Sequence, residues 1–297
     1  MSLPGLKCKA VSKQIPGGIM NSAEPHILVQ DLTMAFGSFV LQRDLTFTVN
    51  RGDIFIIMGG SGCGKSTLLR HLVGLQKPAK GKVIYGNISL WDSDPEVRDN
   101  IMRRCGILYQ SGALWSSMTL AENIAVPIEE YTKLGSQQVR KLTSLKLALV
   151  GLAGFEDYYP SEISGGMKKR AGLARAIALD PDILFFDEPS AGLDPISAHM
   201  LDQLILELRD SFGTTIVVVT HELPSIFAIG NNSVFIDADA KTMLATGDPK
   251  RLLKECRNPT VQNFLTRGKA ETDKAPGETP GSCLTESKNI HGDKSHE

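Results

Sequence analysis

The sequence predicts an α/β fold with a mostly parallel core sheet, an antiparallel β-subdomain and an inserted helical subdomain. Residues 26–36 and 45–49 alternate apolar and polar side chains, as half-buried antiparallel strands do. Short, wholly apolar runs, such as 54–58 and 183–186, alternate with segments of helical periodicity, which is typical of a parallel sheet covered on both faces. The stretch at about 111–175 has helical periodicity without a β-rich segment, so we interpret it as a helical insertion.

The individual elements follow from local patterns along the chain. Leucine and valine side chains recur on one side of a helix predicted at 66–75, directly after the first wholly apolar strand. Thr119 and Glu122 form a capping-box pattern that opens a helix toward Glu130. A second helix of the insertion is predicted at 136–150. The remaining elements are helices at 166–179 and 198–210 and buried strands at 183–186 and 215–219.

Composition and charge bound the domain organisation. The chain has 297 residues, of which 42% are hydrophobic and 22% charged, and this suits one large α/β domain with an inserted subdomain. Its formal net charge of −1 lacks the basic footprint of a nucleic-acid binder, so we expect no nucleic-acid partner. No apolar run approaches the ~18–20 residues that span a bilayer. We predict a flexible leader at 1–24, the folded domain at 25–268 and a disordered polar tail at 269–297.

The strongest local signal is the glycine-rich segment 59–66, which matches the phosphate-binding pattern Gly-x4-Gly-Lys-[Ser/Thr]. Its glycines let backbone N–H groups point toward phosphate oxygens, and the following helix presents its positive N-terminus to the same anion. Lys65 supplies a charge for the β- and γ-phosphates, and Ser66 supplies a hydroxyl oxygen for Mg²⁺. An accidental glycine-rich turn is the alternative, but the flanking strand and helix favour nucleotide binding. The expected nucleotide-binding residues are Gly59, Gly60, Ser61, Gly62, Cys63, Gly64, Lys65, Ser66 and Thr67.

Two carboxylates, Asp187 and Glu188, end the buried strand at 183–186. In ATPases with such a phosphate-binding loop (P-loop), the strand-end Asp helps to hold Mg²⁺, and a neighbouring Glu can act as general base on the attacking water. Taken alone, the pair would more often be two acids in a surface loop. The segment 59–66 favours the catalytic interpretation, because both motifs converge at the same sheet edge in this fold class.

Several further segments resemble the motifs of ABC transporter ATP-binding subunits. They occur in the family's order with similar spacing, and the resemblance covers residues at about 27–250. Residues 163–167, Ile-Ser-Gly-Gly-Met, resemble the signature Leu-Ser-Gly-Gly-Gln, although Met167 lacks the side-chain donor of glutamine. The other segments are Gln110 after the strand 106–109, resembling the Q-loop glutamine; 191–194, resembling the D-loop; His221, resembling the switch histidine; and Phe36, placed like the aromatic residue that stacks on adenine.

The resemblance implies a P-loop NTPase fold of the ABC type and an ATPase that drives transmembrane transport, with ATP and Mg²⁺ as cofactors. It also implies that two copies sandwich two ATP molecules head to tail, with Ser164, Gly165 and Gly166 of one copy capping the γ-phosphate held by the other. The implied catalytic residues are Glu188, His221, Lys65 and Gln110. The implied Mg²⁺ ligands are Ser66, Gln110 and Asp187. The resemblance adds to the nucleotide-binding residues of the loop Phe36, Ser164, Gly165, Gly166 and Asp194.

A narrower resemblance is to the ATPases of Mce-associated lipid transporters, of the maintenance-of-lipid-asymmetry type. It is carried by 110–114, Met167, 194–196 and 258–265. It implies phospholipid or related hydrophobic cargo, integral-membrane permease subunits, an Mce-domain subunit and a small regulatory subunit. The chain would then lie peripherally at the cytoplasmic face of the inner membrane. Residues 258–268 would either clasp a partner subunit or form a frayed surface helix.

Three alternatives stay open beside this interpretation. An ABC transporter for another cargo, such as an amino acid, a metal ion or a drug, would carry the same ATPase motifs, because cargo binds the membrane subunits. A non-transport ABC ATPase of DNA repair or translation is disfavoured, since the chain has neither a long coiled-coil insertion nor a tandem second ATPase domain. A non-hydrolysing scaffold is disfavoured by the intact set of catalytic residues.

Some side chains admit two interpretations. Leu114, Trp115 and Met118 would either dock a permease helix or pack locally. The basic residues 168–170 are interpreted as a solvated helix face rather than as a second phosphate site. Cys63 is interpreted as a tolerated small residue rather than as a redox switch. The histidines without a motif, assigned to the surface or to packing, are His26, His71 and His199.

Overall fold

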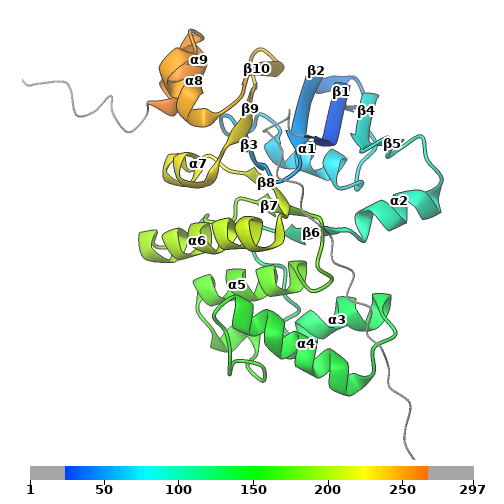
Figure 1. The fold of residues 1–297 in the computed structure, drawn as a ribbon. Helices are drawn as coiled ribbons and strands as arrows, with labels where there is room; N and C mark the ends of the chain where they lie inside the picture. The colour runs from blue at the N-terminus through cyan, green and yellow to red at the C-terminus, as the bar shows by residue number, and fades with distance from the viewer. Residues whose placement is uncertain (1–23, 267–297) are drawn as a thin grey trace, which may run out of the picture.

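The structure, a computed structural model, describes residues 24–266 and arranges them as two sheets surrounded by helices (Figure 1). The larger sheet has six strands in the order β10-β9-β3-β8-β7-β6, and the smaller has four in the order β2-β1-β4-β5. The leader predicted at 1–24, apart from Glu24, and the tail predicted at 269–297 lie outside the described residues. Among the residues described, no helix is both long enough and apolar enough to cross a membrane.

The larger sheet is parallel except at one edge, as predicted. Strands β6, β7, β8, β3 and β9 pair in parallel, and β10 joins β9 antiparallel. Every residue of β3 and β8 is buried, because helices or the second sheet cover both faces. The strands are β3 (Ile54–Met58), β6 (Cys105–Leu108), β7 (Ile183–Asp187), β8 (Thr215–Val219), β9 (Asn232–Asp237) and β10 (Thr242–Thr246).

Alternate residues of the central strand β3 enter two different cores. Ile54, Ile56 and Met58 lie in the core shared with α5, α6, α7 and the helical subdomain. Phe55 and Ile57 lie in the core shared with α1 and the smaller sheet. The period-two geometry of a strand therefore joins the two halves of the molecule through one buried element.

The smaller sheet is antiparallel, as predicted, but it is longer than the sequence indicated. Strand β1 alternates buried and outward residues, and the ring of Phe47 on β2 stacks on Phe55 of the core sheet at 5.3 Å between centroids. Residues 39–44 do not alternate clearly in sequence, and Asp44 adopts a positive φ of 54°, so the first half of β2 was not expected. The bounds are β1 (Pro25–Phe36), β2 (Phe39–Asn50), β4 (Lys80–Tyr85) and β5 (Ile88–Ser89).

Helices α3 and α4 of the helical insertion pack against α5, on the side away from the smaller sheet (Figure 1). The predicted capping box is confirmed: the Thr119 hydroxyl accepts from the Glu122 amide, and the Glu122 carboxylate accepts from the Thr119 amide at 2.7 Å. The insertion contains α3 (Leu120–Tyr131), α4 (Ser136–Leu149), a 3₁₀ turn (Pro160–Glu162) and α5 (Gly165–Ala176).

The remaining helices lie outside the helical insertion. Helix α6 begins three residues before the predicted start because Asp194 caps it, and Gly213 ends it in a left-handed conformation. The C-terminal α9 is packed rather than frayed over its described length, since Phe264 meets Phe235 of β9 edge-on at 5.2 Å. The bounds are α1 (Lys65–Leu72), α2 (Pro95–Met102), α6 (Pro195–Phe212), α7 (Leu223–Ile229), α8 (Pro249–Glu255) and α9 (Pro259–Leu265).

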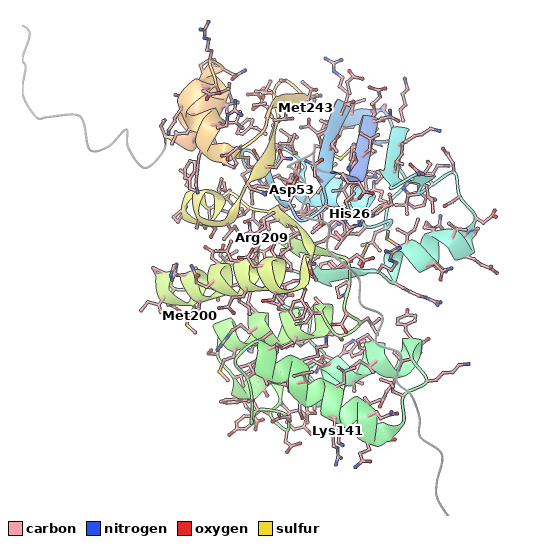
Figure 2. The ribbon with its side chains drawn as sticks, in the orientation of Figure 1. His26, Asp53, Lys141, Met200, Arg209 and Met243 are labelled. Carbon is pink, nitrogen blue, oxygen red and sulfur yellow. The ribbon has the colours of Figure 1, made fainter. Side chains whose placement is uncertain are left out.

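His26 joins the two sheets where the parallel strands begin (Figure 2). Its Nδ1 lies 2.7 Å from the hydroxyl of Thr215 on β8, and its Nε2 lies 3.2 Å from the guanidinium of Arg51. The side chain is buried, so it serves packing, one of the two roles that the sequence left open. Burial, together with the positive charge of Arg51, lowers the pKa of His26 from 6.5 to about 4.

The lowered pKa of His26 predicts acid destabilisation. Folded His26 stays neutral while the unfolded chain binds a proton as the pH falls through 6.5, so stability present above pH 6.5 is lost on the way to pH 4. The lowered pKa of His26 contributes at most about 3 kcal/mol to the free energy of unfolding. We expect His26→Gln to flatten the loss measured by urea unfolding between pH 7 and 4. His199→Gln, on the exposed side of α6, should keep the wild-type pH dependence; equal slopes in all three proteins would contradict the prediction.

Candidate nucleotide-binding site

The glycine-rich segment forms the turn between β3 and α1, and its path requires glycine. Gly59 has a φ of 154°, and a Cβ there would lie 2.2 Å from the carbonyl oxygen of Ile236. Gly64 caps the N-terminus of α1 with a positive φ of 98°. The loop therefore turns tightly enough to place the N-terminus of α1 directly above the end of a buried strand, as a phosphate-binding loop does.

Lys65 lies across this loop instead of pointing into solvent. Its Nζ donates to the carbonyl oxygens of Gly59 at 3.1 Å and Gly60 at 2.9 Å, and the side chain is buried. Cys63 is fully buried beneath the loop, and burial raises the pKa of its thiol. A protonated, inaccessible thiol is a poor nucleophile, so this geometry favours the packing interpretation of Cys63 over the redox one.

Gln42 on β2 holds the loop from below, and no sequence motif indicates this role. Its Nε2 donates to the carbonyl oxygens of Cys63 at 2.8 Å and of Asp237 at 2.7 Å, and its side chain is fully buried. Leu41 and Met34, on the same hairpin as Phe36, approach Gly64. The ring of Phe36 is half-exposed at the tip of this hairpin, where a flat apolar group could contact its face.

The first carboxylate of the predicted pair reaches the loop. The Ser66 hydroxyl donates to Oδ1 of Asp187 at 2.9 Å, across the intervening strand β8. A hydroxyl and a carboxylate oxygen are hard ligands that suit Mg²⁺. Among the described residues, no group of three or more His, Cys, Asp and Glu side chains could hold a metal by itself. The donor set therefore fits a Mg²⁺ ion that takes its other ligands from water and substrate phosphates.

The second carboxylate is paired with His221. Oε1 of Glu188 lies 2.8 Å from Nδ1 of His221, which follows β8, while Oε2 is buried without a hydrogen-bond partner in residues 24–266. Glu188 adopts a positive φ of 49°, a conformation that is costly for a residue with a side chain. Strained backbone and an unpaired buried oxygen mark this carboxylate as a candidate for chemistry rather than for structure.

Gln110 follows β6 at the same edge. The loop after it is held by Arg175 of α5, which donates to the carbonyl oxygens of Ala113 at 2.7 Å and Gly112 at 3.3 Å. The Gln110 side chain is exposed, and no hydrogen bond of this structure joins it to Ser66 or Asp187. The segments after β3, β8, β7 and β6 thus lie at the carboxyl ends of four neighbouring parallel strands.

The residues 164–166 lie elsewhere. Ser164 caps the N-terminus of α5 by accepting from the Met167 amide at 3.3 Å, and Gly166 faces Ser197 of α6. In this chain, none of the three forms a hydrogen bond to the loop 59–66. Asp194 uses its carboxylate to cap α6, where it accepts from the Ser197 hydroxyl at 2.6 Å, and this bond lowers its pKa.

The basic run 168–170 is not uniformly solvated. Lys169 is buried, and its Nζ donates to the carbonyl oxygens of Glu188 at 3.2 Å and Ala191 at 2.9 Å. The interpretation as a solvated face is therefore wrong for Lys169. Three consecutive basic residues carry no sequence signal that separates the buried one, because only the helix orientation decides which side chain points inward.

For the apolar side chains near the start of the insertion, the sequence left open local packing or the docking of a permease helix, and these side chains differ in their exposure. Leu114 packs against the core, whereas Trp115 stays half-exposed. The Trp115 ring lines a groove of about 580 Å³ between α2, α3 and α5, together with Val126 and Tyr131. An exposed aromatic side chain at a groove is typical of an interaction surface.

Fold and site together define an ATP-binding domain of the ABC type. The family model described as "ABC transporter" matches residues 42–191, and the chain belongs to this family. The predicted resemblance is therefore confirmed.

Proteins similar in sequence to this chain are named for transport. The chain is 39% identical over 239 residues to the probable ribonucleotide transport ATP-binding protein mkl of Mycobacterium tuberculosis, covering 80% of this chain but only 66% of that protein. It is 38% identical over 247 residues to the intermembrane phospholipid transport system ATP-binding protein MlaF of Haemophilus influenzae, covering 83% of this chain and 91% of that one. The solved dimer of the ATP-binding cassette MJ0796, bound to ADP and Pi, is 27% identical with a TM-score of 0.68, covering 75% of this chain and 98% of that chain.

The buried ammonium of Lys65 predicts a loss of nucleotide affinity when it is removed. We expect Lys65→Ala to weaken ATP binding about 10- to 100-fold, the usual cost of one charge-assisted hydrogen bond to an anion. Titration with a fluorescent ATP analogue measures the Kd. Lys77→Ala, at an exposed position after α1, is the control and should stay within about twofold of wild type. An unchanged Kd in folded Lys65→Ala would remove the loop from the binding site.

Proposed function

We propose that the protein hydrolyses ATP as the motor subunit of an ABC transporter and works as a head-to-tail dimer. The observation that carries this proposal is the convergence of the loop 59–66, the Ser66–Asp187 pair and the Glu188–His221 pair at one sheet edge. A triphosphate held by the loop would meet the carboxylates at its γ-phosphate end. The family membership supports the same assignment.

The loop residues bind and orient the substrate. Backbone N–H groups of 59–64 and the N-terminus of α1 present positive partial charges to the phosphates. The Lys65 ammonium exchanges carbonyl partners for phosphate oxygens, which are stronger acceptors because they are charged. The exposed ring of Phe36 offers its face to the adenine.

Ser66, Asp187 and Gln110 are the proposed Mg²⁺ ligands, directly or through water. The first two already place oxygens within 2.9 Å of one another, and the Gln110 amide lies on the adjoining loop. When bound, the ion neutralises charge on the β- and γ-phosphate oxygens. The protein's part is to hold these oxygens at the end of the nucleotide site where that charge develops.

Glu188 is the proposed general base. Its Oε2 is free of partners in the described residues and can accept a proton from water, while Oε1 is oriented by Nδ1 of His221. His221 is half-exposed, so its ring can also contact the γ-phosphate and stabilise the charge of the transition state. Positioning and electrostatics together supply most of the catalysis in phosphoryl transfer.

A second copy would complete the site. The N-terminus of the 12-residue helix α5 and the Ser164 hydroxyl make no hydrogen bond to their own loop 59–66, so they are available to a nucleotide bound by another protomer. Gly165 and Gly166 add backbone N–H groups without side chains in the way. The dimeric form of MJ0796 supports this arrangement.

Phospholipid or a related hydrophobic compound is the proposed cargo. The name of the MlaF relative supports it, and the coverage of 91% of that protein makes this relative the better guide to the whole chain. The mkl relatives are named for ribonucleotide transport, which makes ribonucleotides the second candidate.

Membrane subunits would provide the pathway for the cargo. The groove that contains Trp115 and Tyr131 is the proposed docking surface for an integral-membrane permease, which would hold the chain peripherally at the cytoplasmic face of the inner membrane. An Mce-domain subunit and a small regulatory subunit are proposed as further partners, and the packed helix α9 is the candidate contact for one of them.

Replacing the proposed base should stop turnover without abolishing binding. We expect Glu188→Gln to lower phosphate release ~10²–10⁴-fold, the contribution of a general base. The variant should bind ATP and form a dimer with Mg²⁺ and ATP, detected by light scattering after size exclusion. Glu207→Gln, an exposed carboxylate on α6, should match wild type. Near-normal turnover in Glu188→Gln would assign the base to another residue.

The native complex should identify cargo and partners. Affinity purification of the tagged full-length chain from detergent-solubilised membranes should recover a permease, an Mce-domain subunit and bound phospholipid, as measured by mass spectrometry. A matched purification of a Trp115→Asp variant should lose the permease, because a charge at the groove opposes docking. Recovery of a solute-binding protein in place of the Mce-domain subunit would overturn the lipid assignment.

A further inference from the structure

Lys169 is a buried cation that the proposed reaction does not use. It lies in the second turn of α5, and its side chain is 6% exposed. Its ammonium reaches past the helix surface to the segment after β7, where it donates to the carbonyl oxygens of Glu188 and Ala191. Two of its three N–H donors are satisfied in this way, which offsets much of the cost of burying the charge.

The backbone at Glu188 needs this support. A φ of 49° costs a residue other than glycine about 1–3 kcal/mol, so such a conformation persists only where neighbours impose it. Three hydrogen bonds do so here: the Glu188 amide donates to Val219 at 2.8 Å, and its carbonyl accepts from Ala191 at 3.2 Å and from Lys169. Only the bond from Lys169 comes from a helix of the other subdomain.

The carboxylate depends on this backbone conformation. The direction of the Cα–Cβ bond follows φ, so a relaxed peptide at Glu188 would move Oε1 away from Nδ1 of His221, now at 2.8 Å. Charge supports the contact as well. Burial lowers the pKa of Lys169, and the nearby Glu188 carboxylate acts in the opposite direction by favouring the charged ammonium.

We propose that Lys169 is a positioning residue, which locks the peptide of Glu188 to α5 and so aligns the carboxylate for base catalysis. The inference rests on the proposed function, since it needs Glu188 to act as base. It adds a physical link between the N-terminal part of α5 and Glu188. The N-terminus of α5 would cap the nucleotide of the second copy, whereas Glu188 acts on the nucleotide of its own loop.

Kinetics of full-length variants test the role. Lys169→Met keeps the length of the side chain and removes the donors, and we expect kcat to fall about 10- to 100-fold with KM for ATP changed less than about threefold. Lys169→Arg, which restores donors, should recover part of kcat. Lys168→Met, at the preceding position of the helix, is the matched control and should retain wild-type kcat and KM. A wild-type kcat in Lys169→Met would overturn the proposal.

A double-mutant cycle separates positioning from a general structural effect. If Lys169 acts through Glu188, adding Lys169→Met to Glu188→Gln should cause no further loss of turnover. If the losses of turnover in the two single variants multiply in the double variant, the proposal is overturned. If Lys169→Met folds poorly, as judged by its Kd for ATP and its thermal midpoint, the same double-mutant cycle is measured with Lys169→Gln. Absence of ATPase activity in the wild-type chain would instead overturn the proposed function.

Discussion

The site depends on one constraint, which is the parallel pairing of β3, β8, β7 and β6 in that order. Parallel strands end at the same edge, so whatever follows each strand is delivered to one line. The loop 59–66 follows β3, His221 follows β8, the carboxylates end β7 and Gln110 follows β6. Four segments that lie between residues 59 and 221 therefore meet at this edge because of the strand order alone.

Helix α5 ties this edge to the helical subdomain. Its N-terminus carries the residues proposed to cap a second nucleotide, Lys169 holds the segment after β7, and Arg175 holds the loop after β6. Gly172 lets the helix approach that loop closely, since a Cβ there would lie 2.9 Å from the carbonyl oxygen of Gly112. Movement of α5 would thus reach two of the four segments at once.

Much of the site could be predicted because its signals are contiguous. A run such as 59–66 contains its own geometry: glycines for the turn, a strand before it and a helix after it. The two adjacent carboxylates could be assigned only together with this segment, because both motifs converge at the same sheet edge in this fold class. Gln42 and Lys169 could not be found in this way, because each acts on backbone carbonyls far away in sequence, and nothing about an isolated glutamine or a lysine in a basic run indicates such a partner. The same reason explains the first half of β2, whose pairing rather than its pattern makes it a strand.

The fold class, the buried strands and the candidate phosphate-binding loop could all be inferred from sequence alone, because these depend on local periodicity and on glycines whose conformations are set nearby. Three features required the three-dimensional packing: which charged side chains are buried, the strained backbone of Glu188 and its pairing with His221, and the lack of a hydrogen bond between residues 164–166 and their own loop. Those features arise from how helices are rotated and how strands are ordered, and a linear pattern does not contain a through-space partner.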